Sequence, residues 1–228
     1  MIMSKINYGL YFVKRKSFTY GYYVYVAIVY WRSYILKIFN NIVHMIIIKK
    51  KYYLFIENIK DLEIDLLKIN KKINIILRNI KNNETSEIIK FRKKCNNKKI
   101  KFYIANDFRV ANACNADGLY ISAYNKKRYF ANINKIGSAH NIKEINEKIQ
   151  QGCKEIIFSR LFKTNYINKK GFLGVVRFNL LKQTFNKNIY PLGGINNKNL
   201  LKLNIINSDG FAVLSAVKKK PAITSRLF

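Results

Sequence analysis

Acidic side chains are scarce in this sequence, in which 12 aspartates and glutamates stand against 43 lysines and arginines. The resulting formal net charge of +31 would suit a polyanionic partner, such as nucleic acid or an anionic membrane surface. The basic residues are spread along the chain rather than clustered, and asparagine, isoleucine, tyrosine and phenylalanine are abundant as well. We therefore interpret the charge mainly as a compositional bias. General polyanion binding and recruitment of phosphorylated small molecules are the alternatives.

Cysteine and histidine are also rare, and their spacing excludes the common metal and disulfide frameworks. The three cysteines, Cys95, Cys114 and Cys153, form no CxxC pair and have no zinc-site spacing to His44 or His140. We expect the cysteines to be small buried apolar residues in a reducing compartment, which predicts a cytoplasmic protein.

The first 44 residues lack acidic side chains altogether, and the first acid in the chain is Glu57. The run "FTYGYYVYVAIVYW" (18–31) is shorter than the ~20 apolar residues that a membrane-spanning helix needs, and no small-residue cleavage site follows it. We treat 1–44 as a basic, aromatic extension with three open interpretations: a membrane anchor, an element packed on the domain, or a stretch ahead of a true start at Met45. The domain itself is predicted over residues 45–228.

Short apolar runs alternate with amphipathic runs from about residue 50 onward. The predicted strands are 51–56, 73–78, 100–106, 118–122, 135–139, 155–161, 188–193 and 210–216, and helical runs are clearest at 84–95, 141–151 and 196–203. Near-continuous apolar strands are typical of a parallel sheet with both faces buried. Eight of them with intervening helices predict an α/β fold, a (β/α)8 TIM barrel. A doubly wound open sheet is the alternative, but no GxGxxG follows the first strand.

Polar residues and glycines gather where the predicted strands end, which is where a barrel of this kind has its active site. In strand order they are Arg78, Lys81, Asn106, Asp107, Ser138, His140, Asn141, Arg160, Lys163, Thr164, Gly193, Gly194, Ser215 and Ala216. Bare backbone N–H groups in the last two loops of a barrel often hold a phosphate, and paired glycines before a helix start suit that role. The set predicts an anionic ligand with several oxygens.

Several of these residues have a purely structural alternative. The glycine pair could form a tight turn, and Asp107 could cap the next helix. His140 could be a structural histidine, while Asn141 could cap a helix together with Glu144 in a capping box. Lys163 could be an ordinary solvated charge.

Five stretches resemble, in order, motifs of the thiamine phosphate synthases. The two longest are "FYIANDFRVANACNADGLYIS" and "IGSAHNIKEINEKIQQGCKEIIFSRLFKT". They resemble the family's "INDxxxLAxxxxADGVHLG" and "GxSxHxxxEaxxAxxxGaDYIxxxPvFpT". In addition, "IILRNIK", "PLGGINNKNL" and "DGFAVLSAV" resemble "QlReK", "aiGGIxxxN" and "GvAvvSAI". The resemblance covers about residues 50–217 and leaves 1–44 outside.

The resemblance implies a (β/α)8 barrel that joins hydroxymethylpyrimidine diphosphate to thiazole phosphate and releases pyrophosphate, with Mg2+ as cofactor. It implies phosphorylated small molecules, and no nucleic acid, as partners. The catalytic residues would be Arg78, Lys81, Asn106 and Ser138, facing the pyrimidine diphosphate together with Asn141. Asp107 would ligate Mg2+, and Lys163 and Thr164 would approach the phosphates. Gly193, Gly194, Ser215 and Ala216 would hold the thiazole phosphate.

The sequence departs from the family pattern most clearly around the implied metal site. Asn125 stands where the family has a second acid, Ala123 replaces a glutamine, and Lys163 replaces a proline. Thiazole tautomerases share much of the pattern, so three hypotheses stay open. The first is a transferase, and the second is a tautomerase-like or inactive phosphate-binding barrel. The third belongs to a different class of protein function: a basic protein that associates with membranes or nucleic acid.

Overall fold

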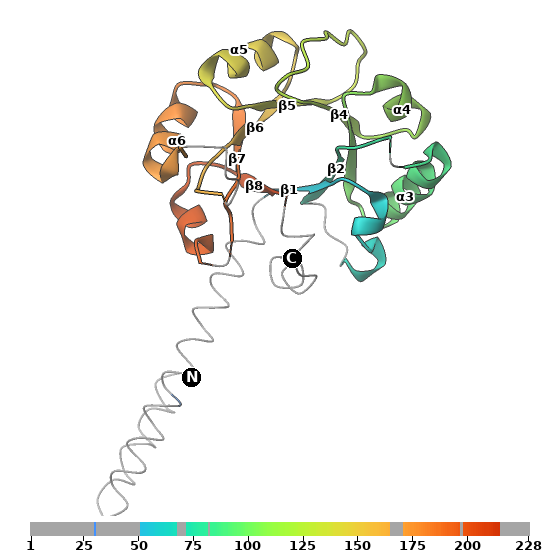
Figure 1. The fold of residues 1–228 in the computed structure, drawn as a ribbon, viewed down its shortest axis with the longest axis horizontal. Helices are drawn as coiled ribbons and strands as arrows, with labels where there is room; N and C mark the ends of the chain where they lie inside the picture. Colours follow the sequence, from blue (N-terminus) through green and yellow to red (C-terminus); the bar gives the residue numbers. More distant parts are fainter. Residues whose placement is uncertain are drawn as a thin grey trace, which may run out of the picture. The chain divides into compact units, whose positions relative to one another are not determined.

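The computed structural model describes residue 30 and residues 51–67, 72–81, 83–164, 171–196 and 198–214. Eight parallel strands form a closed barrel in chain order (Figure 1). They are β1 (Lys51–Ile56), β2 (Ile73–Leu77), β3 (Lys101–Ala105), β4 (Gly118–Ile121), β5 (Lys135–Ala139), β6 (Glu155–Ser159), β7 (Asn188–Leu192) and β8 (Gly210–Val213). The predicted (β/α)8 barrel is confirmed. Apart from residue 30, the extension 1–44 and the proposed start at Met45 lie outside the described residues.

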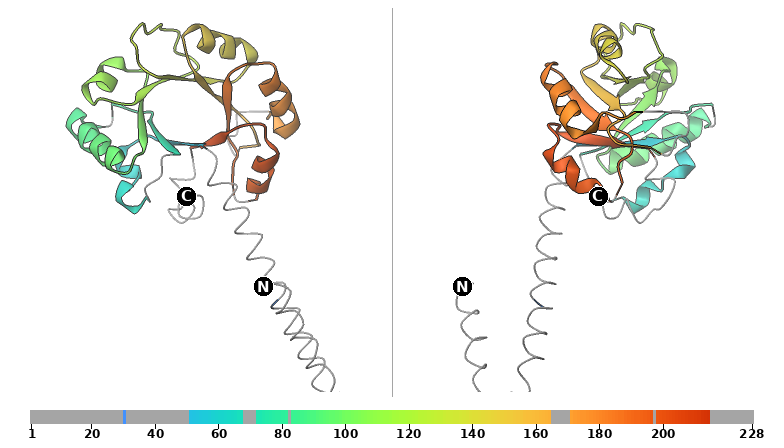
Figure 2. Two further views of the ribbon diagram at one scale, coloured as in Figure 1. Left: turned by 180° about the vertical axis from the view of Figure 1, so that it is seen from behind. Right: turned by 60° about the vertical axis from the view of Figure 1, so that its left-hand side comes forward.

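Helices pack around the outside of the barrel, where they cover the outward faces of the strands (Figures 1 and 2). The α-helices are α3 (Thr85–Asn97), α4 (Phe108–Ala113), α5 (Ile142–Gln150) and α6 (Gly174–Gln183), and the 3-10 helices are η2 (Ile59–Asp61), η3 (Ile64–Leu66) and η4 (Leu200–Ile205). Of the helices in the described part of the chain, none has the length and apolar character needed to cross a membrane.

The predicted helical run 196–203 is instead a turn followed by the 3-10 helix η4. Asparagine side chains explain the difference, because they hydrogen-bond to nearby backbone groups and so compete with the α-helix. Asn199 Oδ1 accepts from the backbone N–H of Asn196, and Asn196 Oδ1 accepts from that of Lys198, both at 2.9 Å.

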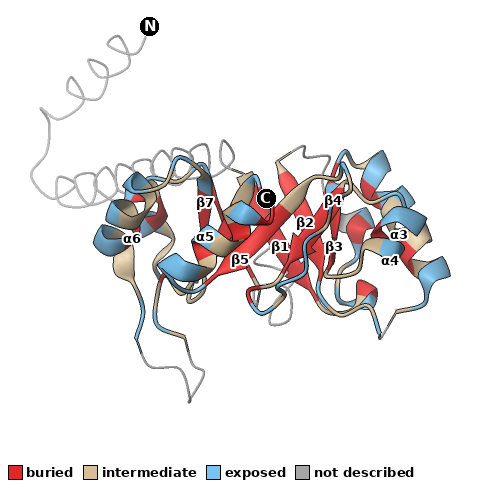
Figure 3. Cartoon of the chain, turned by 90° about the horizontal axis from the view of Figure 1, so that it is seen from above, coloured by how far each residue is buried: buried red, intermediate tan, exposed pale blue. Residues whose placement is uncertain are grey.

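The strands are buried along most of their length (Figure 3). Because successive side chains of a strand point to opposite faces, one set fills the interior of the barrel and the other faces outward. The buried inner core consists of Tyr53, Phe55, Ile76, Tyr103, Ala105, Tyr120, Ile136, Ile157, Tyr190 and Ala212. Both faces of each strand are therefore apolar, which is why the strands read as continuous apolar runs in the sequence.

A charged cluster lies among the tyrosines at the amino end of the barrel. Lys51 Nζ is 2.5 Å from Glu155 Oε1, and the hydroxyl of Tyr53 donates to the other oxygen of the same carboxylate. Burial and the negative charge of Glu155 raise the pKa of Tyr53, so its phenol stays neutral and remains a donor. The ion pair of Lys51 and Glu155 thus closes the interior of the barrel at this end. The aromatic rings of the inner core pack directly above it.

Asn141 is the N-cap of helix α5, as one interpretation of the sequence had it, but the Glu144 carboxylate accepts from the backbone N–H of His140 and not from that of Asn141, as a capping box would require. Asn141 Oδ1 accepts from the backbone N–H of Glu144 at 2.9 Å, and Asn141 Nδ2 donates to Glu144 Oε1 at 2.9 Å. The Glu144 carboxylate also accepts the backbone N–H of His140 at 2.7 Å. This cap fixes the direction in which the chain leaves β5.

The connection from β4 to β5 has no helix in its described residues, 122–134, and a buried lysine holds it in place. Lys148 Nζ, from α5, donates to the carbonyl oxygen of Asn125 at 2.8 Å and to Gln151 Oε1 at 2.9 Å. Gln151 Nε2 donates to the same Asn125 oxygen at 2.9 Å. Burial lowers the pKa of Lys148.

The barrel closes where β8 pairs with β1, and Gly210 makes this closure possible. Gly210 lies opposite Lys51 in the register, and a Cβ at Gly210 would overlap the backbone carbonyl of Lys51. Any side chain there would force the two strands apart, because the obstructing atoms are backbone rather than the end of a flexible side chain.

We therefore expect Gly210→Ala to lower the free energy of unfolding by about 3 kcal/mol or more, as overpacking at a rigid contact does. Urea unfolding followed by circular dichroism measures the change. Asp209→Ala, at the neighbouring exposed position, is the control and should change stability by no more than about 0.5 kcal/mol. Equal stability of the Gly210→Ala variant and the wild type would contradict this account of closure.

Candidate active site

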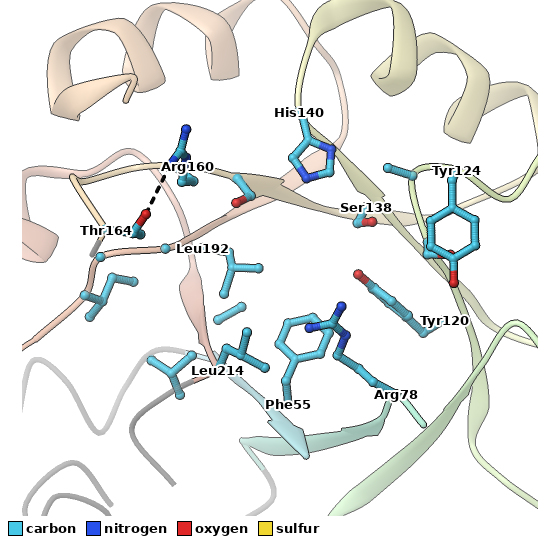
Figure 4. Close-up of a pocket in the computed structure, with 18 residues that line it drawn as sticks. Phe55, Arg78, Tyr120, Tyr124, Ser138, His140, Arg160, Thr164, Leu192 and Leu214 are labelled. Carbon is cyan, nitrogen blue, oxygen red and sulfur yellow. Dashed lines mark hydrogen bonds between the residues drawn. The ribbon is translucent and has the colours of Figure 1, made fainter. Parts of the chain in front are cut away.

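A cavity of about 370 Å3 opens at the carboxyl ends of the strands (Figure 4). It is lined by Phe55, Arg78, Tyr120, Ser122, Ala123, Tyr124, Ser138, His140, Ser159, Arg160, Thr164, Leu192, Gly193, Gly194, Ile195, Ala212, Val213 and Leu214. Five of the residues singled out from the sequence as site residues come together here: Arg78, Ser138, Thr164, Gly193 and Gly194. Their convergence follows from the barrel, because parallel strands bring all their carboxyl ends to one rim.

Arg78 follows β2 and extends over the aromatic floor of the cavity (Figure 4). Its guanidinium carbon is 5.9 Å from the ring centre of Phe55, and the Phe55 and Tyr120 rings meet edge to face at 5.3 Å. Burial raises the pKa of Tyr120, although the Ser138 hydroxyl and the charge of Arg78 act in the opposite direction. Tyr120 is therefore a neutral hydrogen-bond donor beside a fixed positive charge.

Arg160 lies across the cavity from Arg78, at the end of β6 (Figure 4). Its Nη1 donates to Thr164 Oγ1 at 3.1 Å. The stem of the side chain passes close to Gly193, where a Cβ would come within 3.2 Å of Arg160 Cγ. Sequence reasoning places Arg160 near a strand end but does not assign it to the site, because nothing in the sequence shows which way a side chain points beyond the last paired residue.

Gly193 and Gly194 both have backbone conformations that favour glycine, with φ of +101° and +70°. A Cβ at Gly194 would lie 2.5 Å from the carbonyl oxygen of Lys163 and 2.6 Å from that of Phe162. The segment after β6, at Phe162 and Lys163, therefore makes the closest approach to the backbone of Gly194. Within the described residues, the N–H groups of Gly194 and Ile195 donate no hydrogen bond to the protein, although both residues line the cavity.

Asn106 does not line the cavity, but it holds two residues that do. Its Oδ1 accepts from the backbone N–H and the hydroxyl of Ser122, each at 2.9 Å, and from Asn125 Nδ2 at 3.0 Å. Its Nδ2 donates to the hydroxyl of Tyr124 at 3.2 Å. Asn106 has a φ of +60°, a conformation that asparagine tolerates better than most residues.

His140 is held at the rim of the cavity by Glu144. His140 Nδ1 is 3.0 Å from Glu144 Oε2. Partial burial favours the neutral form of Glu144, but hydrogen bonds from His140 and Asn141 outweigh it and hold the pKa of this carboxyl below its usual range. Glu144 is therefore a carboxylate at neutral pH, and it orients the imidazole.

The other predicted site residues lie outside the cavity lining or outside the described chain. Asp107 Oδ1 accepts from the backbone N–H of Val110 at 3.0 Å and so caps α4. Lys81 and Lys163 are exposed, and Asn141 caps α5. Ser215 and Ala216 lie outside the described residues. The ligand-binding roles of these residues stay predictions.

The residues present do not fit the Mg2+ site that the family resemblance implies. Mg2+ is usually held by one or two carboxylates together with substrate phosphates. No aspartate or glutamate is among the described residues that line the cavity, and Asp107 is engaged as a helix cap. The side-chain amide of Asn125 donates to Asn106 Oδ1 and to the hydroxyl of Tyr129. Across the part of the chain that the structure describes, no three His, Cys, Asp or Glu residues are grouped to hold a metal ion.

Comparison with solved structures supports the fold. Thiamine phosphate pyrophosphorylase from Pyrococcus furiosus matches with a TM-score of 0.61 and 20% identity, over 78% of this chain and 92% of that one. The enzyme of the same name from Bacteroides thetaiotaomicron matches with a TM-score of 0.56 and 14% identity, over 78% and 93%. A 3-keto-L-gulonate-6-phosphate decarboxylase from Vibrio cholerae is similar too, with a TM-score of 0.57 and 12% identity, over 78% and 95%.

Identities this low establish a shared barrel rather than a shared reaction. No protein with a curated description matches the chain significantly by sequence. The family model for thiamine monophosphate synthase, however, matches residues 45–217, which is more than half of the chain. The chain therefore belongs to the thiamine monophosphate synthase family.

Proposed function

We propose that the protein is a transferase of the thiamine phosphate synthase type, which joins hydroxymethylpyrimidine diphosphate to thiazole phosphate and releases pyrophosphate. The observation that carries the proposal is the cavity at the carboxyl end of the barrel, where two guanidinium groups meet backbone N–H groups that donate to no described residue. Since no carboxylate is among its described lining residues, the cavity is suited to anionic ligands.

The proposed reaction needs positive charge where the leaving group departs. The bond between the pyrimidine methylene carbon and the diphosphate oxygen breaks, and the electron pair leaves with the oxygen. The lone pair of the thiazole nitrogen then forms the new carbon–nitrogen bond. Preorganised donors aimed at the developing negative charge are usually the largest contribution to catalysis in such a step. Arg78, Tyr120 and Ser138 are the donors at the centre of the cavity.

The apolar part of the lining suits the two heterocycles. Phe55, Tyr124, Leu192 and Leu214 contribute aromatic and aliphatic surface to the lining of the cavity (Figure 4). Ligand pockets commonly combine such walls with a few polar groups that fix orientation. In this proposal Gly193 and Gly194 approach the thiazole phosphate with Ser215 and Ala216, while Asn106 positions Ser122 and Tyr124. Lys81, Asn141, Lys163 and Thr164 keep the substrate-facing roles that the resemblance implies.

A tautomerase-like activity on thiazole phosphate is the second candidate, and His140 is the observation that favours it. An imidazole at the cavity rim, oriented by Glu144, has the arrangement of a general acid–base group. A barrel that binds phosphates without turnover is the remaining outcome. The cytoplasmic location, and the role of 1–44 as an anchor or a stretch ahead of Met45, also stay proposals.

The direct test is pyrophosphate release by the purified full-length chain supplied with both precursors. We expect release that depends on both substrates, and Arg78→Ala should lower kcat/KM on the order of 100-fold, as loss of one transition-state donor does. Arg109→Ala, at an exposed position outside the cavity lining, is the control and should leave kcat/KM unchanged. Absence of product under conditions where an established synthase is active would refute the transferase proposal.

Gly194→Ala should weaken binding of thiazole phosphate before it affects the pyrimidine substrate. The added methyl would press on the carbonyls of Phe162 and Lys163 and displace the loop at the proposed phosphate position. Gly171→Ala is a matched control, because Gly171 has a φ of +80° and a Cβ there would have no neighbouring atom within 4 Å. Both variants should lose roughly 1–2 kcal/mol of stability from backbone strain. Only Gly194→Ala should raise KM for thiazole phosphate, and equal KM values in the two variants would count against the phosphate position.

His140→Ala separates the transferase from the tautomerase. If His140 is the acid–base group of a tautomerase, its loss should lower thiazole phosphate turnover on the order of 100-fold or more. The transferase reaction needs no proton transfer by His140, so its rate should change far less. Lys143→Ala, at an exposed position in the first turn of α5, three residues after His140, controls for changes in this helix. Unchanged tautomerase turnover in His140→Ala would remove this candidate.

A further inference from the structure

The positive charge of the cavity comes from both sides of the barrel mouth. Arg78 approaches from the end of β2, and Arg160 approaches from the end of β6 (Figure 4). The described lining residues include no aspartate or glutamate. Two like charges that face a cavity lined in this way favour a bound anion, because the anion relieves their mutual repulsion.

Thr164 and Gly193 are among the neighbours that fit Arg160 into its place. Thr164 accepts a hydrogen bond from one terminal nitrogen of the guanidinium, at 3.1 Å. Gly193 leaves room for the stem, since a Cβ there would come within 3.2 Å of Arg160 Cγ and 3.3 Å of Arg160 Cβ. In the motif that this stretch resembles, proline stands at the position of Arg160. The guanidinium is thus a departure of this chain, and the glycine beside it accommodates it.

The same chain lacks part of the implied metal site. Asn125, at the place of the family's second acid, uses its amide to bind Asn106 and Tyr129. Asp107 caps α4 and does not line the cavity. The carboxylates that would hold a divalent cation are therefore missing from the described lining of a cavity that contains two arginines.

We propose that Arg160, together with Arg78, supplies the charge that a divalent cation would otherwise supply, so that this cavity binds phosphate and diphosphate groups without metal. An arginine can hold phosphate oxygens with two parallel N–H donors and is charged at all relevant pH values. The inference rests on the proposed function for the identity of the ligands. It goes further than the proposed function in two respects. Arg160 contacts the anion directly, and binding of the anion requires no metal ion.

Calorimetric titration of the full-length protein with inorganic pyrophosphate, in excess EDTA, tests the inference. We expect wild-type protein to bind pyrophosphate under these conditions, and Arg160→Ala to bind it about 10- to 100-fold more weakly, as loss of a charge-assisted hydrogen bond predicts. Arg160→Lys keeps the charge without the paired donors and should fall between the two. Arg109→Ala is the control, with unchanged affinity expected, and thermal unfolding verifies that each variant is folded.

Binding that appears only when Mg2+ is added would overturn the inference, as would equal affinity of wild type and Arg160→Ala in EDTA. The outcome is separable from that of the proposed function. Binding in EDTA that depends on Arg160, without formation of thiamine phosphate, would refute the transferase and leave the anion site standing. If thiamine phosphate forms only when Mg2+ is present, and Arg160→Ala is as active as wild type, the transferase proposal stands and the metal-free anion site is refuted.

Discussion

The closure of eight parallel strands into one barrel is the constraint on which the candidate site depends. Because all strands run in the same direction, the residues that follow them meet at a single rim, although up to about 140 positions separate them, as Arg78 and Leu214 are separated. Closure in turn depends on the seam between β8 and β1, where only glycine leaves room for the facing backbone. The register of the strands thus determines which side chains meet at the rim.

The charge of the site is the second organising feature. The chain as a whole is strongly basic, but net charge alone carries little information about function. What matters is that Arg78 and Arg160 lie at one cavity while the nearby acids are engaged elsewhere. Asp107 caps a helix, and Glu144 binds His140 and a helix end. Concentrating one sign of charge in a partly enclosed space makes the empty site less favourable and the anion-bound site more so.

The strands and the barrel could be predicted from the sequence because burial on both faces leaves a strong apolar signal. Arg78, Ser138 and the glycine pair could be located because each directly follows a strand whose end is clear. Arg160 could not be assigned, since alternation of side chains stops being reliable beyond the last paired residue. The contact of Gly194 with the carbonyl of Phe162 was equally hidden, because it depends on how two loops distant in sequence pack together. Asn196 and Asn199 are visible in the sequence, but their bonds to the backbone, which accompany a 3-10 helix at Leu200–Ile205 in place of the predicted helical run, depend on local geometry.

The cluster of Lys51, Glu155 and Tyr53 has a consequence for traffic through the molecule. It lies at the amino end of the barrel beneath a packed aromatic interior, so buried side chains separate it from the cavity at the carboxyl ends of the strands. A ligand that enters from the carboxyl ends of the strands therefore meets this aromatic layer as the floor of its site, and it cannot pass along the barrel axis while the layer stays packed.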